Sequence, residues 1–290
     1  MVAFNASKLN LPFMKYRLYA IVISLVLVAA SLGLIATKGL NLSVDFTGGL
    51  VLQVEFSSPV QVSDIRASLS EIGQGQAIIQ AYDNNEVLIR FQAQDEEVRR
   101  EVLETLKKDF GGLKILKIDK VGPVVGQELR TQAFIALSLA LVGILLYMAF
   151  RFKFRFGVAA VLALMHDSII MLGVYSLTGK EVSVAFIAAI LTVVGYSLND
   201  TIVVLDRVRE NWTAVRTKGV VELVDMSINQ TLARTINTSL TTLLPVIAMF
   251  IFGGEVISNF AFAFLVGIVV GTYSSIYIAS SIVAEWYLRY

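Results

Sequence analysis

The sequence predicts a membrane α-helical protein with six transmembrane helices and one small α+β domain outside the cytoplasm. Three observations lead to this fold class. The chain is 56% hydrophobic and 16% charged, whereas soluble domains average about 45–50% apolar and about 25% charged residues. The apolar residues gather in blocks close to the roughly 20 residues that cross a bilayer as a helix. Basic residues recur in every second short connection between these blocks.

Six blocks have spanning character, and the fifth is expected to begin earlier than its apolar core, near Leu232. They are Leu18–Ala36, Ala133–Phe150, Phe156–Leu177, Val182–Val204, Leu240–Phe252 and Ile257–Val283. The first block could be compared with the core of a secretory signal peptide. It exceeds the about 7–15 residues of such a core, and no Ala-x-Ala-like cleavage site follows it. We therefore expect a retained anchor.

Lysine and arginine in the short connections predict the orientation, because cytoplasmic loops carry an excess of both. They lie in the N-terminal tail and in the connections between blocks two and three and between blocks four and five. The connection between blocks three and four has only Lys180, and the next outer connection has none. Both termini are therefore expected in the cytoplasm. The predicted parts are residues 1–37 (tail and first helix), 38–130 (outer domain) and 131–290 (five helices, with a cytoplasmic amphipathic segment at 207–233).

Within residues 38–130, the hydrophobic patterns predict the order strand–helix–strand–strand–helix–strand. The expected elements are Val51–Phe56, Val62–Ile72, Ala77–Ala81, Glu86–Phe91, Val98–Phe110 and Leu113–Val121. Ser63 and Asp95 are expected to cap the two helices, and Tyr82-Asp83-Asn84-Asn85 to form a hairpin turn. This order is typical of the split βαβ, or ferredoxin-like, arrangement.

Composition argues against several kinds of site. The net charge of +1 gives no bulk attraction for nucleic acid. The absence of cysteine excludes disulfides, thiolate metal ligands and thiol nucleophiles, and a single histidine excludes a histidine-rich metal site from this chain alone. We therefore expect neither a metal site nor a nucleic-acid partner.

Asp200 is an ionisable residue within or at the edge of the fourth predicted span. It ends the run Gly195-Tyr196-Ser197-Leu198-Asn199-Asp200. A charge at mid-bilayer costs roughly 3 kcal/mol on insertion scales, so such groups face a protein interior or a watery path. Asp200 is either a functional group of this kind or a helix-end residue wetted by the cytoplasm. Ser197 and Asn199 beside it add polar groups that are poorly suited to facing lipid.

Two further sets of ionisable residues fall in the predicted spans. Arg234 begins the fifth span, where a cytoplasmic helix-end arginine is equally expected from the charge bias. His166 and Asp167 lie near the middle of the third span. They are either a functional pair or a polar contact between helices. Adjacent helical residues point about 100° apart, so these two need not share a partner.

An aspartate and an arginine on two helices could couple proton binding to movement. A nearby guanidinium favours the ionised carboxylate, whereas burial without it favours the protonated form. Proton binding would then shift the balance between two conformations.

Gly267-x-x-x-Gly271 in the last span predicts close helix packing. We favour packing within the chain over a dimer contact.

Several motifs, in the same order, resemble the SecD/SecF family of protein-export membrane proteins. Val44-Asp45-Phe46-Thr47-Gly48-Gly49 resembles the Asp-Phe-x-Gly-Gly signature after the first span, with Asp45, Phe46, Gly48 and Gly49 on its fixed positions. Val121-Gly122-Pro123-x-x-Gly126 resembles the segment before the second span. The run that ends in Asp200 resembles the fourth-span signature of the SecF branch. Further matches are Asp206–Asn211, Gln230–Thr235, Phe252–Gly254 and Gly267–Tyr277.

The resemblance runs from Asn41 to about Ala279 and is closer to SecF than to SecD, whose outer domain is much larger. It implies half of an RND-like membrane fold and an accessory subunit of Sec protein export. Such a subunit uses the proton gradient, with no cofactor, to promote polypeptide movement through SecYEG. The implied partners are SecD as a separate chain, SecYEG, YajC, SecA indirectly, the exported unfolded polypeptide and membrane lipid.

The resemblance also places particular residues. Asp200 and Arg234 match the family's proton-path positions, and His166-Asp167 matches a His-Asp of its third span. The implied location is the bacterial cytoplasmic membrane. An alternative within the superfamily is a proton-coupled small-molecule exporter, although such pumps usually hold both six-span halves in one chain.

An intramembrane enzyme is a third interpretation. Ser197 with His166, or Asp167 with Asp200, would supply the residue types of a serine or an aspartyl protease. The surrounding sequences do not match the motifs of such proteases, so we expect no enzymatic activity.

Overall fold

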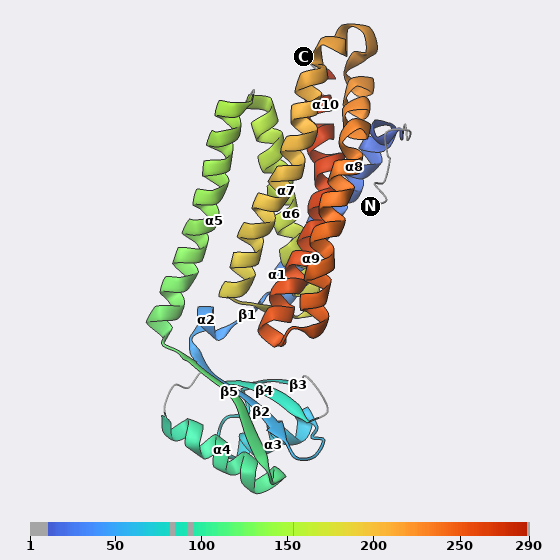
Figure 1. Ribbon diagram of the computed structural model, residues 1–290. Helices are drawn as coiled ribbons and strands as arrows, with labels where there is room; N and C mark the ends of the chain where they lie inside the picture. The colour runs from blue at the N-terminus through green and yellow to red at the C-terminus, as the bar shows by residue number, and fades with distance from the viewer. Residues whose placement is uncertain (1–10, 82–84, 92–95, 153, 289–290) are drawn as a thin grey trace. The chain divides into compact units, whose positions relative to one another are not determined.

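The computed structural model describes residues 11–81, 85–91, 96–152 and 154–288 (Figure 1). The chain divides into two compact units, a helical unit of Met1–Asn41 with Ile135–Tyr290 and an α+β unit of Leu42–Phe134. Compared with the predicted outer domain, 38–130, the α+β unit begins four residues later and ends four residues later.

The α+β unit holds one antiparallel sheet and two longer helices. In chain order its elements are α2 (Val44–Thr47), β2 (Gly49–Phe56), α3 (Val62–Glu71), β3 (Ile78–Ala81), β4 (Glu86–Phe91), α4 (Glu96–Phe110) and β5 (Leu113–Val121). The strands lie in the order β3-β4-β2-β5, with every neighbouring pair antiparallel. From β2 to β5 the element order matches the predicted one, because strand and helix periodicities are both local signals.

The core of the α+β unit lies between the sheet and the two helices. Leu52 and Ile89 from the strands are fully buried against Ile65 and Leu69 of α3 and Leu106 of α4. These positions alternate along the strands and recur at helical spacing along the helices, which explains why the pattern was visible in the sequence.

One predicted helix cap is wrong. Helix α3 begins at Val62, after Gln61, whose backbone is extended and whose side chain makes no cap hydrogen bond. Ser63 instead lies inside the first turn, where its hydroxyl donates to Asp64 Oδ1 at 3.2 Å. Asp95 and most of the predicted hairpin turn, residues 82–84, lie outside the described residues.

The helical unit contains the long helices of the chain. They are α1 (Arg17–Lys38), α5 (Pro123–Arg151), α6 (Phe154–Thr178), α7 (Val184–Glu210), α8 (Val215–Phe252), α9 (Glu255–Tyr273) and α10 (Ser280–Leu288). Helix α5 begins in the α+β unit and ends in the helical unit. Shorter elements are η2 (Phe13–Tyr16), η3 (Asn211–Ala214), the π-helical turn η4 (Ser274–Ala279), β1 (Asn41–Leu42) and β6 (Glu181–Val182). Strands β1 and β6 pair with each other.

Among the described residues, five helical segments are long and apolar enough to cross a membrane. They are Phe13–Lys38, Val124–Arg151, Phe154–Thr178, Val184–Phe252 and Ile257–Leu288. The fourth has 69 residues because α7, η3 and α8 are adjacent in sequence, although the chain turns back between α7 and α8 (Figure 1) and the backbone at Gly219 is not helical. It contains both the fourth and the fifth predicted span.

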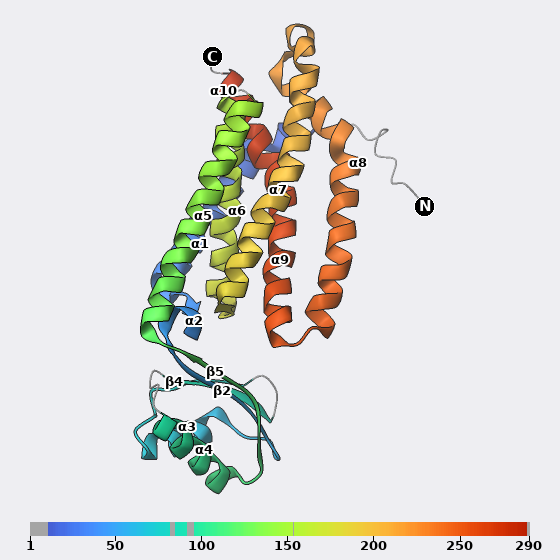
Figure 2. The same cartoon turned by 60° about the vertical axis from the view of Figure 1, so that its left-hand side comes forward.

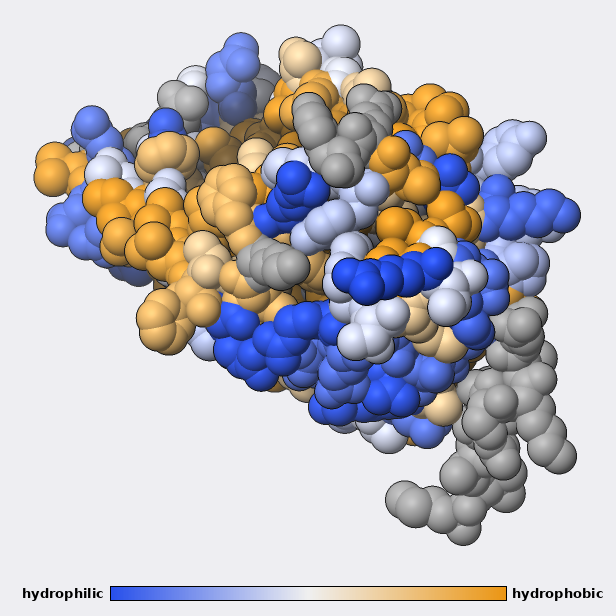
Figure 3. All heavy atoms as spheres, turned by 90° about the horizontal axis from the view of Figure 1, so that it is seen from above, coloured by the Kyte–Doolittle hydropathy of each residue, from blue (hydrophilic) through white to orange (hydrophobic). Residues whose placement is uncertain are grey.

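Burial differs strongly between these helices, and Figure 2 shows α5 at one side of the helical unit. Helices α6 and α9 lie within the unit, whereas α1 and α5 carry large exposed apolar side chains, such as Leu25 on α1 and Phe150 on α5. Exposed apolar side chains at these positions suit contact with lipid. Figure 3 views the molecule from above, toward the end where α7 passes into η3, and hydrophilic side chains gather there beside apolar ones.

Helices α1 and α6 approach each other closely at Gly173. A Cβ atom placed there would overlap the Ser31 hydroxyl and lie 2.8 Å from Ser31 Cα. Only glycine therefore fits at this crossing, as is common where membrane helices pack through small residues.

Candidate functional site

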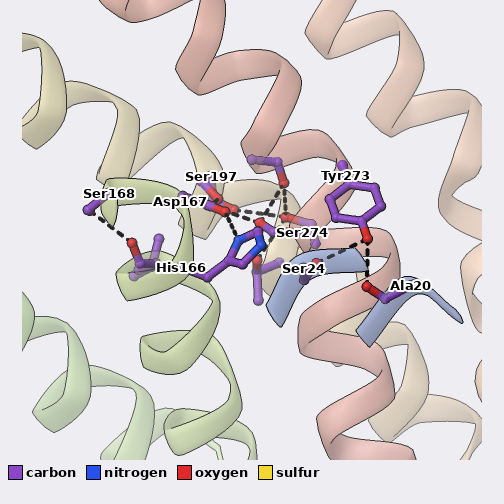
Figure 4. A network of polar contacts seen from close by, with 12 residues as sticks. Ala20, Ser24, His166, Asp167, Ser168, Ser197, Tyr273 and Ser274 are labelled. Carbon is purple, nitrogen blue, oxygen red and sulfur yellow. Dashed lines mark hydrogen bonds and ion pairs between the residues drawn. The ribbon is translucent and has the colours of Figure 1, made fainter. Parts of the chain in front are cut away.

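Four buried polar side chains meet in the interior of the helical unit, and we call them the Asp167 cluster (Figure 4). His166 and Asp167 come from α6, Ser197 from α7 and Ser274 from the first residue of η4. Their exposed fractions are 7%, 1%, 1% and 0%. Polar groups this deeply buried are costly unless they are hydrogen-bonded to one another.

Asp167 is the centre of the cluster. Its Oδ1 lies 2.9 Å from His166 Nδ1, and its Oδ2 accepts hydrogen bonds from Ser197 Oγ at 2.7 Å and Ser274 Oγ at 2.8 Å. These contacts compensate the buried carboxylate and tie α6 to α7 and to the π-helical turn. His166 and Asp167 also contact each other directly, although adjacent helical side chains point in different directions.

The π-helical turn η4 brings two consecutive serines into the interior. Ser274 faces Asp167, while Ser275 Oγ lies 2.8 Å from Thr201 Oγ1 of α7. Both serines are fully buried. Single π-helical turns inside α-helices are frequent at functional sites, and here the turn coincides with the polar centre of the unit.

A second polar contact links η4's neighbour α9 to α1. Tyr273 donates its hydroxyl to Ala20 O at 3.0 Å, and the same hydroxyl lies 3.1 Å from Ser24 Oγ (Figure 4). The Tyr273 ring lies 6.3 Å from the His166 ring, measured between centroids. The Asp167 cluster is thus bordered by a tyrosine that is itself fixed to α1.

Asp200 lies one helical turn beyond Ser197 on α7. Its exposed fraction is 2%, and its Oδ2 has no hydrogen-bond partner among the described residues. Residues three apart on a helix share a face, so Asp200 and Ser197 point toward the same interior region. The structure therefore places Asp200 inside the protein and not at a wetted helix end.

Arg234 of α8 is exposed and forms no ion pair with Asp200 among the described residues. It is still close enough for its positive charge to act on the Asp200 carboxylate. The two residues are thus near neighbours without direct contact. Asn199, beside Asp200, lies on the exposed face of α7.

Gly267 and Gly271 lie where α9 packs on α7. A Cβ at Gly267 would lie 3.0 Å from Val193 Cβ, and one at Gly271 would lie 2.9 Å from Ser197 Cβ. These contacts are made within the chain. They hold the end of α9, and with it Ser274, against the helix that carries Ser197 and Asp200.

The Asp-Phe-x-Gly-Gly signature forms a compact loop in the α+β unit. Ser43 accepts a hydrogen bond from Asp45 N at the start of α2, and Phe46 is buried with an exposed fraction of 4%. Gly48 and Gly49 have φ values of 69° and 128°, which favour glycine. The two glycines of the signature are therefore required by the backbone of this turn.

The loop is held by the beginning of α5. A Cβ at Gly126 would lie 3.0 Å from Gly48 N, and Arg130 Nη2 donates to Phe46 O at 2.8 Å. Gly126 belongs to the second motif found in the sequence, so the structure brings two separate motifs into direct contact. Both are parts of the α+β unit and lie apart from the Asp167 cluster in sequence.

Ser197 and His166 are not arranged as the nucleophile and base of a serine protease. Ser197 and His166 each bind Asp167, through Oδ2 and Oδ1 respectively, whereas a serine nucleophile would bond to the histidine. Ser274 and Ser275 were not among the candidate residues identified in the sequence. Their polarity within an apolar span was the signal that could have identified them.

Comparison with known proteins gives the family context. Residues 101–289 match the family described as "Protein export membrane protein SecD/SecF, C-terminal", and residues 33–60 match "SecD/SecF GG Motif". The chain is 46% identical over 291 residues to the protein translocase subunit SecF of Desulfurispirillum indicum, covering 97% of this chain and 93% of the relative. It is 42% identical over 280 residues to the SecF subunit of Pseudomonas aeruginosa, covering 96% and 91%.

A longer relative contains this sequence as one part. The chain is 46% identical over 283 residues to the protein translocase subunit SecDF of Thermus thermophilus, covering 94% of this chain and 38% of that protein. A crystal structure of SecDF from the same organism, described as a translocon-associated membrane protein, matches with a TM-score of 0.92 at 44% identity. That match covers 98% of this chain and 39% of the SecDF chain.

Proposed function

Because the chain belongs to the SecD/SecF family of protein-export membrane proteins, we propose that it is a SecF-type subunit that converts the proton gradient into export of polypeptide. Its relatives are subunits of the protein translocase, which is a transport role and not a catalytic one. Together with the apolar helices, they make it a multi-pass bacterial membrane protein. In the proposed role it acts with SecD and assists translocation through SecYEG.

The proposed architecture has six crossings of the cytoplasmic membrane, with both termini in the cytoplasm. Helix α7 has 27 residues and α8 has 38, with a break at Gly219, so each is longer than roughly 30 Å at 1.5 Å per residue. The hydrocarbon core is only about 30 Å thick, so α7 and α8 each supply one crossing. Four basic residues lie near the junction of α7 and α8, namely Arg207, Arg209, Arg216 and Lys218. They support a cytoplasmic position for this junction.

The strand order β3-β4-β2-β5 supports a ferredoxin-like outer domain.

The observation that carries the proton-coupled role is the state of Asp200. Its carboxylate is buried and Oδ2 is unpartnered among the described residues, while the charge of Arg234 lies near but not in contact. Approach of the guanidinium would favour the ionised carboxylate, and its withdrawal would favour the protonated one. A small movement of α8 relative to α7 would therefore load or release a proton. Each proton that crosses 100 mV supplies about 2.3 kcal/mol.

The proposed partners follow from the family. The Thermus thermophilus relative is a SecDF protein in which this chain corresponds to 38% of the length, which supports SecD as the direct partner. SecYEG, YajC and, indirectly, SecA are the further proposed partners, and unfolded polypeptide is the substrate. The proton gradient is the energy source, so the proposed function needs no bound cofactor.

The test is proton-driven export by a complex that carries Asp200→Asn. Membrane vesicles with the SecD complex would translocate a reporter polypeptide at saturating ATP, with and without a proton gradient. We expect the variant to assemble normally and to lose the stimulation by the gradient. Gly195→Ala is the matched control, because a Cβ at Gly195 meets nothing within 4 Å one turn away on the same helix. Full stimulation of the Asp200→Asn complex would refute the role.

A further inference from the structure

His166 has one ring nitrogen in contact and one without a partner. Nδ1 lies 2.9 Å from Asp167 Oδ1, whereas Nε2 is buried and has no hydrogen-bond partner among the described residues. The side chain is 93% buried, since its exposed fraction is 7%. An unpartnered polar atom at this depth is rare and calls for an explanation. It is also the only histidine in the chain.

The contacts of Asp167 indicate which nitrogen carries the proton. Oδ2 accepts from two hydroxyl groups, those of Ser197 and Ser274. When Asp167 is ionised, both of its oxygens are acceptors. Oδ1 then also accepts, and Nδ1 of His166 must be the donor. In the neutral imidazole the other nitrogen, Nε2, is therefore a bare lone pair.

The charge balance of the pair favours the addition of one proton. An ionised Asp167 beside a neutral His166 leaves one net negative charge in the interior, where charge is poorly solvated. A proton on Nε2 would convert the pair into an imidazolium and a carboxylate in direct contact, with no net charge. Opposite charges at hydrogen-bond distance favour the charged form of each partner.

We propose that Nε2 of His166 is a second proton-binding atom of the helical unit, and that the Asp167 cluster passes protons on the route that includes Asp200. This inference rests on the proposed function and deepens it. A hydronium ion donates its proton to the Nε2 lone pair, an N–H bond forms and water is left. Release is the reverse step. Ser197, bonded to Asp167 and one turn from Asp200, lies between the two sites.

Proton binding has a defined consequence for the π-helical turn. When the pair is neutral overall, the pull of Asp167 Oδ2 on the Ser274 hydroxyl weakens. Ser274 Oγ already lies 3.1 Å from a second acceptor, Gly271 O in its own helix. Rotation of one hydroxyl therefore breaks the hydrogen bond between η4 and α6 without leaving a donor unpaired. The charge of the pair would thereby control one link between the helices.

Few other titratable groups face the pair. Helix α9 contributes Tyr273, and η4 contributes Tyr277, which stacks on Tyr273 with 5.4 Å between centroids. Helix α7 contributes Asp200. Helix α1 contributes Ser24, whose hydroxyl carries no charge. Helix α10 carries two ionisable residues. Glu285 is paired with Arg17, and Tyr287 packs on Phe156.

The single histidine allows a direct test by nitrogen NMR. The full chain, purified without a histidine tag and labelled with ¹⁵N-histidine, would be placed in lipid nanodiscs and measured from pH 9 to pH 5. We expect a protonated Nδ1 and a bare Nε2 at high pH. On acidification, the Nε2 signal should shift to the position of a protonated nitrogen while Nδ1 stays protonated.

Asp167→Asn is the matched variant, because it keeps the size of the side chain and removes its charge. We expect the Nε2 signal of this variant to stay at the bare position over the same range. The proposal is overturned if, in the unmodified chain, Nε2 carries the proton at pH 9 or remains bare at pH 5. Normal proton-driven export by Asp200→Asn would instead refute the proposed function, and it would leave the NMR result unaffected.

Discussion

Gly271 of α9 lies directly against Ser197 of α7, so closely that a Cβ on Gly271 would come within 2.9 Å of both Cβ and Oγ of Ser197. The same serine donates to Asp167, and Ser274 follows Gly271 by three residues. The close approach of the two helices is therefore what allows hydroxyl groups from both to reach one carboxylate. Packing and polar contacts depend on each other at this point.

Gly271→Ala should disturb this contact. The added methyl group must displace Ser197, and overpacking of this kind typically costs about 1–3 kcal/mol. Thermal unfolding of the full chain in detergent, followed by circular dichroism, would measure the loss. Gly143→Ala on α5 is the control, because a Cβ there meets nothing within 4 Å, and its unfolding temperature should not fall. Equal stability of the two variants would contradict the close packing.

Ser274→Ala should destabilise the helical unit by about 1–3 kcal/mol, since it removes a donor from a buried carboxylate. The control is Thr192→Ala on α7, whose hydroxyl bonds only to Ala188 O of its own helix on an exposed face. Denaturant unfolding of both variants gives the comparison. If Ser274→Ala cost no more than Thr192→Ala, the hydroxyl would not be holding the carboxylate.

Gly126→Ala should loosen the signature loop of the α+β unit. Its methyl group would meet backbone atoms, Gly48 N at 3.0 Å and Phe46 O at 3.3 Å, which cannot turn aside as a side chain can. We expect a cost of about 1–3 kcal/mol, seen as faster amide hydrogen exchange around Gly48 and Gly49 in the full chain. Gly122→Ala, with nothing within 4 Å of its Cβ, should leave exchange unchanged, and similar exchange in both variants would argue against this contact.

Arg234→Met should lower proton-driven export while leaving the SecD complex assembled. We expect about a tenfold loss of gradient-driven export, which corresponds to about 1.4 kcal/mol, and vesicle translocation with and without a gradient would measure it. Arg216→Met is the control, because Arg216 is an exposed arginine at the start of α8. Full gradient-driven export by the Arg234 variant would show that another residue acts on Asp200.

The elements of the α+β unit were predictable because each depends on residues close in sequence. Leu113–Val121 was predicted with the bounds that β5 has in the structure. The cap at Ser63 was wrong because capping depends on the backbone conformation of one residue, which periodicity does not determine. In the helical unit, the apolar blocks located the helices. Helices α7 and α8 extend beyond their apolar blocks, so helix length alone does not show where the membrane ends.

The Asp167 cluster was only partly predictable. Its residues on α6 stood out as ionisable groups at membrane depth, but their partners come from positions 30 and 107 residues away. Which face of α9 meets α6 depends on helix packing and on the π-helical turn. Neither leaves a periodic trace in the sequence. The distance between Asp200 and Arg234 also depends on helix packing, so it could not be derived from their separation in the sequence.

The π-helical turn at Ser274–Ala279 also changes how this part of the chain should be aligned and engineered. Such a turn holds about one residue more than an α-helical turn, so every later residue is rotated by about 100° around the axis. A helical wheel drawn through Ile257–Leu288 with one fixed period would assign the wrong side to α10. Deletion of a single residue within the turn would restore a regular helix while turning Ser280 and Ser281, both fully buried, away from the positions that they now fill.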